Sequence, residues 1–309
     1  MDCIFELKCQ PQVSLSGFRN IASLDKSPTH KVIKAGSFFR LFDQKLVQRY
    51  RCCDCQKTFS DESLNICKYQ KKRHLNQPLF ELLCSGASLR RSAHLLRTNR
   101  KTIVRKFVFL GENALSVIEQ KQHLFHRSHI NTMVFDDMES FEHSKCKPLS
   151  MTIAVEEKTR LILGFNVASM PAKGLLVKKA LKKYGKRKDE RREKRAELFH
   201  QIKDVLAPSA IIKSDMSTFY SNEVRTFFPN SQHVVFKGRK GCVVGQGELK
   251  SGGFDPLFSL NHTAAMFRAN VNRLFRRTWN TRKKAMCLNY HMALYTLYHN
   301  FKITAASSA

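Results

Sequence analysis

Between residues 130 and 240 the apolar positions form short runs rich in β-branched and aromatic side chains, separated by polar turns. The runs TMVFDD, PLSMTIAVEE and RLILGFNVAS are typical of consecutive strands joined by tight connections. A highly charged helical stretch follows from about Lys173 to Asp204, and then come the strand SAIIKSD, a helix at NEVRTFF and the strand QHVVFK. We therefore expect an α/β domain over residues 130–304, in which helices flank a mixed sheet.

Residues 75–117 show a helical period instead. The first predicted helix, in LFELLCSG, stops at Gly86. Ser88 is placed to cap a second short helix, which contains Ala93 at a tightly packed position. A third helix, RKTIVRKFVFL, follows a turn at Thr98 and Asn99. This spacing favours a small helix-turn-helix domain whose third helix enters the major groove of DNA. The side chains expected to face DNA are Arg100, Lys101, Thr102 and Arg105, and those expected to face the core are Ile103, Val104 and Phe107. The alternative is an ordinary helical bundle with solvated basic faces.

The first 62 residues hold cysteines at spacings that suit a metal. Cys52 and Cys55 form a C-x-x-C pair after the β-prone RYR, and Cys3 and Cys9 lie upstream with five residues between them. Four thiolates can bind one structural zinc ion, so residues 1–62 are expected to form a zinc-ribbon-like module, with an insertion at 11–26. His30 is an alternative ligand, and the other interpretation is that Cys52 and Cys55 are free thiols.

The chain is strongly basic. Its 309 residues include 54 Lys and Arg against 25 Asp and Glu, a formal net charge of +29 that is spread along the sequence. Such a field attracts phosphates and gives salt-sensitive binding to polyanions, although RNA or an anionic membrane surface would suit the charge as well as DNA. No apolar run approaches the ~18 residues that a spanning helix needs, and MDCIFELKCQ does not resemble a signal peptide, so we expect a soluble, cytoplasmic protein.

Two aspartates lie at the ends of predicted strands, Asp136 in the first and Asp215 in the fourth. The succession of three strands, a helix and then alternating strand and helix resembles a ribonuclease H-like core, in which the first and fourth strands carry the carboxylates of the site. Two carboxylates on adjacent strands can hold divalent metal ions against a phosphodiester. Alternation along a strand turns Asp136 and Asp137 to opposite faces, so only one of the two can enter the site. Asp137, Glu139 and Glu142 are the reserve candidates.

The C-terminal helical segment FSLNHTAAMFRANVNRLFRRTW contains no acid. Asn261 opens it, and Arg268 follows seven residues later, two turns on along the same face. An amide oxygen can coordinate magnesium without adding charge, and an arginine on that face can grip the phosphate being transferred. Glu248 and Asp255, in the glycine-rich GQGELKSGGFDP, are alternative acids.

Taken together, RYRCCDCQKTFS, SLRRSAHLLRTNRKTI, FDDMESFEH, IIKSD and LNHTAAMFRANVNRLFRRTW resemble bacterial insertion-sequence transposases, over nearly the whole chain from about residue 27. The most similar group has an N-terminal zinc ribbon and an Asp-Asp-Asn catalytic set followed by a basic residue. The resemblance selects Asp136 over Asp137 and implies that Asp136, Asp215 and Asn261 bind Mg²⁺ or Mn²⁺, with Arg268 as the basic residue. It implies a DNA transposase that recognises the terminal inverted repeats of its element, acts on double-stranded DNA and assembles as a homo-oligomer.

Other classes of function fit parts of the pattern. A regulator that only binds DNA through a zinc ribbon and a helix-turn-helix, or an inactivated transposase copy, needs no catalytic carboxylates. A ribonuclease H-like nuclease that cuts without strand transfer would share the same metal site. The irregular first cysteine pair and the insertion at 11–26 depart from the family pattern and weaken the zinc prediction.

Overall fold

The computed structural model describes residues 31–41, 44–60, 63, 65–68, 70–125, 130–237, 255–275 and 284–307. The chain divides into two compact units, Met1–Pro78 and Leu79–Ala309. Both contain a β-sheet, and helices are added mainly in the second, so the expected α/β class is confirmed. Cys3, Cys9, the insertion at 11–26 and His30 lie outside the described residues.

The first unit contains a three-stranded antiparallel sheet in the order β1-β2-β3. Its strands are β1 (Val32–Arg40), β2 (Lys45–Cys52) and β3 (Thr58–Ser60). The sheet is held by stacking of Tyr50 on Phe59, with ring centroids 5.5 Å apart, and by the Arg49 guanidinium 4.8 Å from the ring of Phe38. A short 3₁₀ turn, η3 (Arg73–Leu75), precedes the first helix among the described residues.

The helices expected in residues 75–117 are present as α2 (Asn76–Cys84), α3 (Leu89–Leu95) and α4 (Arg100–Phe125). Ser88 caps α3 as predicted, because its hydroxyl accepts a hydrogen bond from the Arg91 N–H at 3.2 Å. The side chain of Asn99 likewise accepts from the Lys101 N–H at 2.8 Å at the start of α4. Ile103 and Phe107 are buried as expected, whereas Val104 is 38% exposed, so its prediction as a core residue was wrong.

The second unit is built on a five-stranded sheet in the order β6-β5-β4-β7-β8. All five predicted strands are found, as β4 (Ile130–Phe141), β5 (Pro148–Glu156), β6 (Ile162–Ser169), β7 (Leu206–Asp215) and β8 (Gln232–Phe236). The first three strands of this unit pair antiparallel, whereas β7 runs parallel to β4 and β8 runs parallel to β7. The mixed sheet therefore has β4 at its centre.

The charged stretch that follows β6 contains two helices, α5 (Leu176–Tyr184) and α6 (Arg191–Ile202), and ends in the 3₁₀ turn η4 (Lys203–Val205). Gly185 ends α5 with a positive φ of 73°. One face of the sheet packs against α6 and α7 (Tyr220–Phe227), where the ring of Phe135 meets Phe199 at 5.0 Å and Tyr220 at 4.9 Å.

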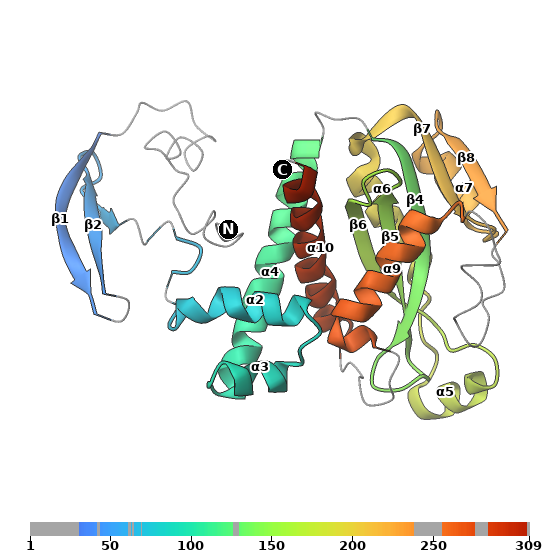
Figure 1. Cartoon of the computed structure of the whole chain (residues 1–309), viewed down its shortest axis with the longest axis horizontal. Helices are drawn as coiled ribbons and strands as arrows, with labels where there is room; N and C mark the ends of the chain where they lie inside the picture. The colour runs from blue at the N-terminus through green and yellow to red at the C-terminus, as the bar shows by residue number, and fades with distance from the viewer. Residues whose placement is uncertain are drawn as a thin grey trace. The chain divides into compact units, whose positions relative to one another are not determined.

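The other side of the sheet carries α9 (Phe258–Asn270), which lies across β4 and β5 in Figure 1, followed by η5 (Asn272–Leu274). Helix α10 (Ala285–Ser307) runs alongside α4 and β6. Asn300 of α10 pairs with both backbone groups of Ile162 at 2.9 Å, which satisfies part of the edge of β6. Among the described helices, none is both long and apolar enough to cross a lipid bilayer.

Candidate metal centre

The two predicted aspartates lie side by side at the centre of the five-stranded sheet. The parallel strands β4 and β7 pair Val134 with Lys213. Two residues further along each strand, Asp136 and Asp215 occupy neighbouring positions on the same face as Val134 and Lys213. The negative charge of Asp215 also helps to raise the pKa of Asp136. The fold thus joins two carboxylates that are 79 positions apart in the sequence (215 minus 136).

Asp136 sits in a partly buried environment that disfavours its charge. Burial, together with the neighbouring Asp215, raises the pKa of Asp136 from 3.8 to about 6. Two donors oppose this effect, because Oδ1 of Asp136 accepts hydrogen bonds from the Asp137 N–H at 2.7 Å and from the Tyr220 hydroxyl at 3.2 Å. The carboxylate is therefore oriented through one oxygen and is close to half-protonated at mildly acidic pH.

Asp137 points to the opposite face, as alternation predicts, and belongs to a buried ion-pair network. Its Oδ1 accepts from the Thr152 hydroxyl at 2.5 Å and its Oδ2 from Arg195 Nη1 at 2.6 Å. The same guanidinium donates to both oxygens of Glu223, at 2.5 and 3.0 Å. Burial alone would lower the pKa of Arg195, but the hydrogen bond with Glu223 and the charges of both carboxylates raise it above its ordinary value. Asp137 is thus committed to a structural role.

Tyr220 connects this network to the aspartate pair. Its ring packs on Phe135, and the Arg195 guanidinium lies 4.9 Å from the ring centroid. Burial and the nearby aspartates raise the pKa of Tyr220, so its hydroxyl stays protonated and can donate to Asp136. A chain of contacts therefore runs from Glu223 through Arg195 and Tyr220 to Asp136.

Asp215 ends β7 and is more open than Asp136. Its Oδ1 accepts the Ser217 N–H at 3.2 Å, which fixes the turn into α7. Burial and the charge of Asp137 raise its pKa, while the Ser217 N–H and Arg195 act in the opposite direction. On the same strand face, the Lys213 ammonium pairs with Glu157 at 2.6 Å, so it is not directed at Asp215.

The predicted third ligand, Asn261, lies in the first turn of α9. Its amide donates to Asp255 Oδ2 at 2.8 Å, while Oδ1 of Asp255 accepts the Leu257 N–H at 2.9 Å. Asn261 is exposed and makes no hydrogen bond to Asp136 or Asp215. Arg268 is half-buried in the last turn of the helix. The structure thus places the alternative acid Asp255 beside Asn261, whereas Glu248 lies outside the described residues.

The reserve carboxylates Glu139 on β4 and Glu142 just after it have other partners. Glu139 pairs with Lys173 at 2.5 Å, and Glu142 pairs with Arg187 at 3.3 Å. Within the described ranges, no three or more His, Cys, Asp or Glu side chains gather into a metal-binding group. The centre therefore offers two adjacent carboxylates. Such a pair fits a divalent cation, because the charge of the cation would favour the ionised carboxylates whose pKa values burial raises.

The other predicted sites lie at the start of α4 and around the C-x-x-C pair, where Cys52 is buried and Cys55 is exposed. Arg100, Lys101 and Arg105 are exposed at the start of α4 and Thr102 is half-buried. Cys52 and Cys55 are free, and backbone N–H groups of Cys55 and Asp54 lower the pKa of the Cys52 thiol, which favours the thiolate that a metal needs. Cys67, Cys84 and Cys146 are buried and form no disulfide, and Cys67 Sγ accepts a hydrogen bond from the Asn76 amide at 3.6 Å.

Sequence reasoning missed Arg195, Glu223 and Tyr220. Arg195 is only 4% exposed, although it lies in the charged run that favoured a solvated helix. Its spacing was the available signal, because Arg195 precedes Phe199 by four residues and Ile202 by seven, on the apolar face of α6.

Compared with known proteins, the chain matches no family model and no curated sequence.

Proposed function

We propose that this protein is a metal-dependent enzyme that cuts and joins DNA, a transposase of the insertion-sequence type. The observation that carries the proposal is the pairing of Asp136 with Asp215 on adjacent parallel strands, where burial raises both pKa values, the charge of Asp215 adds to the rise at Asp136, and the charge of Asp137 adds to the rise at Asp215. Carboxylates whose charges are disfavoured without a counter-ion are typical of functional sites.

The arrangement of the sheet supports the same proposal. The order β6-β5-β4-β7-β8, with β5 antiparallel to β4 and with β7 and β8 parallel to it, matches the strand order of a ribonuclease H-like core. In that fold the catalytic carboxylates occur on the first and fourth strands, which correspond here to β4 and β7. A helix that crosses the first strands, as α9 does, supplies the remaining residue of the site.

In the proposed mechanism Asp136, Asp215 and Asn261 would hold Mg²⁺ or Mn²⁺. When bound, these ions activate the attacking oxygen and stabilise the leaving oxygen of an in-line displacement at phosphorus. Tyr220 and the Asp137 N–H orient one oxygen of Asp136, which leaves Oδ2 available for a cation. Arg268 would contact the phosphate, because a guanidinium can donate two parallel hydrogen bonds to it.

Binding of double-stranded DNA would fall to the basic surfaces. The net charge of +29 supplies sequence-independent affinity, and the exposed Arg100, Lys101 and Arg105 of α4 would read the terminal inverted repeats. We place the protein in the bacterial cytoplasm, on the nucleoid, as a homo-oligomer that joins two element ends. A zinc ion on Cys52 and Cys55 with Cys3 and Cys9 would complete the N-terminal module.

A second candidate is a DNA-binding regulator or an inactivated copy. It is favoured by one observation, the absence of a third carboxylate beside Asp136 and Asp215 among the described residues. Such a protein would retain the basic surface and the helices α2 to α4 but would not cleave DNA.

A strand-cleavage assay separates the two candidates. Purified full-length protein is incubated with Mg²⁺ or Mn²⁺ and with labelled duplexes that carry the DNA ends flanking its gene. The transposase predicts metal-dependent nicking at those ends and then joined products, both lost in Asp215→Asn while DNA binding is retained. Tight binding with no cut in the wild type would favour the regulator.

A further inference from the structure

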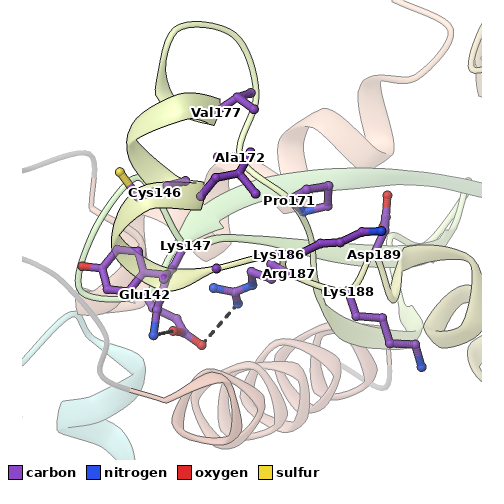
Figure 2. Close-up of a pocket in the computed structure, with 14 residues that line it drawn as sticks. Glu142, Cys146, Lys147, Pro171, Ala172, Val177, Lys186, Arg187, Lys188 and Asp189 are labelled. Carbon is purple, nitrogen blue, oxygen red and sulfur yellow. Dashed lines mark hydrogen bonds and ion pairs between the residues drawn. The ribbon is translucent and has the colours of Figure 1, made fainter.

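A cavity of about 680 Å³ lies at the far end of β4, outside the aspartate pair. It is enclosed by the turn between β4 and β5, by the segment after β6, and by α5 with the residues that follow it (Figure 2). Its volume falls in the range of about 300–1,000 Å³ that is usual for sites binding small organic molecules. Part of its lining is apolar, with Pro171, Val177 and Leu181 among the residues that form it.

The polar wall of the cavity is held in place by ion pairs. Glu142 accepts from Arg187 at 3.3 Å and lies 3.8 Å from the Lys147 ammonium, as the dashed lines of Figure 2 show. Arg187 is fixed further by donating through Nε to the Ser169 hydroxyl at 2.5 Å. The Lys147 ammonium also lies 4.7 Å from the ring centroid of Tyr184. The Lys183 ammonium, at 5.4 Å, and the edge-on ring of His143, at 5.7 Å, also contact the Tyr184 ring. One preformed site thus contains a planar guanidinium and a ring held by its neighbours.

The lining of the cavity is net positive, with Lys147, Lys186, Arg187 and Lys188 beside Glu142 and Asp189, and the adjoining stretch of chain is more basic. Residues 173–188 contain eight Lys and Arg and no Asp or Glu. Within the described part of the chain, Lys186 in the lining forms no ion pair with an acid, nor do the neighbouring Lys178, Lys179 and Lys182, which lie outside the lining. Lysines without acidic partners are available to phosphate. The ligand that matches an apolar, aromatic cavity with such basic surroundings is a planar ring that carries phosphate groups, which is the chemistry of a nucleotide.

We propose that this cavity takes up one unstacked nucleotide of the bound DNA, with its base inside and the flanking phosphates on Lys186 and on the neighbouring lysines of α5 outside the lining. The proposal rests on the proposed function, since it needs DNA as the partner. Glu142 lies six residues beyond Asp136, or about 20 Å along an extended chain. A DNA strand that follows β4 would cover that distance in about six nucleotides of duplex. The base held in the cavity would therefore lie about six nucleotides from the cleaved bond.

Such a contact has a defined use. Unstacking is least costly at mismatched, flexible or single-stranded positions, and stacking on an aromatic ring or a guanidinium recovers part of the cost. The cavity would thus favour DNA ends that open easily and would fix the register of the strand relative to Asp136 and Asp215. An acidic peptide would use the same lysines but would not need an unstacked base.

Fluorescence of 2-aminopurine tests the proposal. Full-length protein is titrated with duplexes of one DNA end, each with 2-aminopurine at a different position, and binding is followed separately by anisotropy. We expect increased fluorescence at one position when the protein binds.

Two variants of the cavity lining test the assignment. Leu181→Asp, at a side chain that is 51% exposed, should remove the fluorescence increase and weaken DNA binding about 5- to 100-fold, and Tyr184→Ala should do the same. Leu175→Ala, at a fully exposed residue outside the cavity lining, is the matched control and should behave as wild type.

The outcomes distinguish this site from the proposed function. DNA binding and cleavage without a fluorescence change at any position, or with a change that persists in both cavity variants, would overturn the nucleotide site alone. Wild-type protein that neither binds nor cuts DNA would overturn the proposed function, and the nucleotide site with it. Retention of the fluorescence change in Leu175→Ala and its loss in Leu181→Asp supports the site even where Tyr184→Ala fails to fold.

Discussion

Replacing Asp136 by Asn should stabilise the metal-free protein at neutral pH. Burial and Asp215 raise the pKa of Asp136 from 3.8 to about 6. A carboxyl with a higher pKa in the folded chain stabilises the fold while it is protonated, below about pH 4, and this contribution is lost as the pH rises through about 6. Asn mimics the protonated side chain and can still accept from Tyr220 and the Asp137 N–H through its oxygen.

The size of the effect follows from the shift. A change of about 2 pH units corresponds to about 3 kcal/mol, at about 1.4 kcal/mol per unit. At about pH 8 the Asp136→Asn variant should therefore gain up to about 3 kcal/mol in free energy of unfolding over wild type, whereas at about pH 4 the two proteins should differ little. Added Mg²⁺ should stabilise the wild type and have little effect on the variant, because the variant lacks one of the paired charges.

Urea denaturation in a chelating buffer at both pH values measures the difference, and a second series contains Mg²⁺. Glu139→Gln is the matched control, since this carboxylate lies on the same strand but is exposed and pairs only with Lys173 on the surface. The reasoning is refuted if Asp136→Asn is no more stable than wild type at about pH 8, or if Mg²⁺ stabilises both proteins equally.

Three further predictions concern the surroundings of the site. Arg195→Met should lower the free energy of unfolding, measured by urea denaturation, by about 3–5 kcal/mol, because Asp137 and Glu223 lose their common partner. Arg191→Met, which breaks a more exposed pair with Asp189, should lower it by about 1 kcal/mol or less. Equal losses would contradict the buried network. Tyr220→Phe should raise the pKa of Asp136 further, so that the shift in melting temperature caused by Mg²⁺ moves to higher pH; an unchanged profile would remove Tyr220 from the site. Elemental analysis should find one zinc ion per chain that is lost in Cys55→Ser, and a wild-type stoichiometry near zero would end the zinc prediction.

The strands and the short helices could be predicted because their signals are local. The β-branched runs identified β4 to β8, and Ser88 before an apolar period identified the start of α3. The neighbouring positions of Asp136 and Asp215 were expected from the resemblance of this succession of elements to a ribonuclease H-like core. Alternation also separated Asp136 from Asp137 correctly, because it depends only on backbone geometry.

The contacts around the site could not be predicted, because they join residues that are far apart in the sequence. Arg195 meets Asp137 across 58 positions and Tyr220 meets Asp136 across 84. The dense charge of residues 178–197 concealed one buried arginine among many exposed side chains. The prediction for Val104 failed for a related reason, because an apolar residue on a helix lies on the solvent side when its neighbours already fill the core.

The most direct test of a metal centre at Asp136 and Asp215 is cleavage of the chain by a bound iron ion. Fe²⁺ replaces Mg²⁺ at carboxylate sites and, with ascorbate and peroxide, generates hydroxyl radicals that cut the nearest backbone. The account predicts fragments that end near residues 136 and 215, suppressed by excess Mg²⁺ and absent from Asp136→Asn and Asp215→Asn. Cuts confined to other parts of the chain, or the same cuts in both variants, would contradict it.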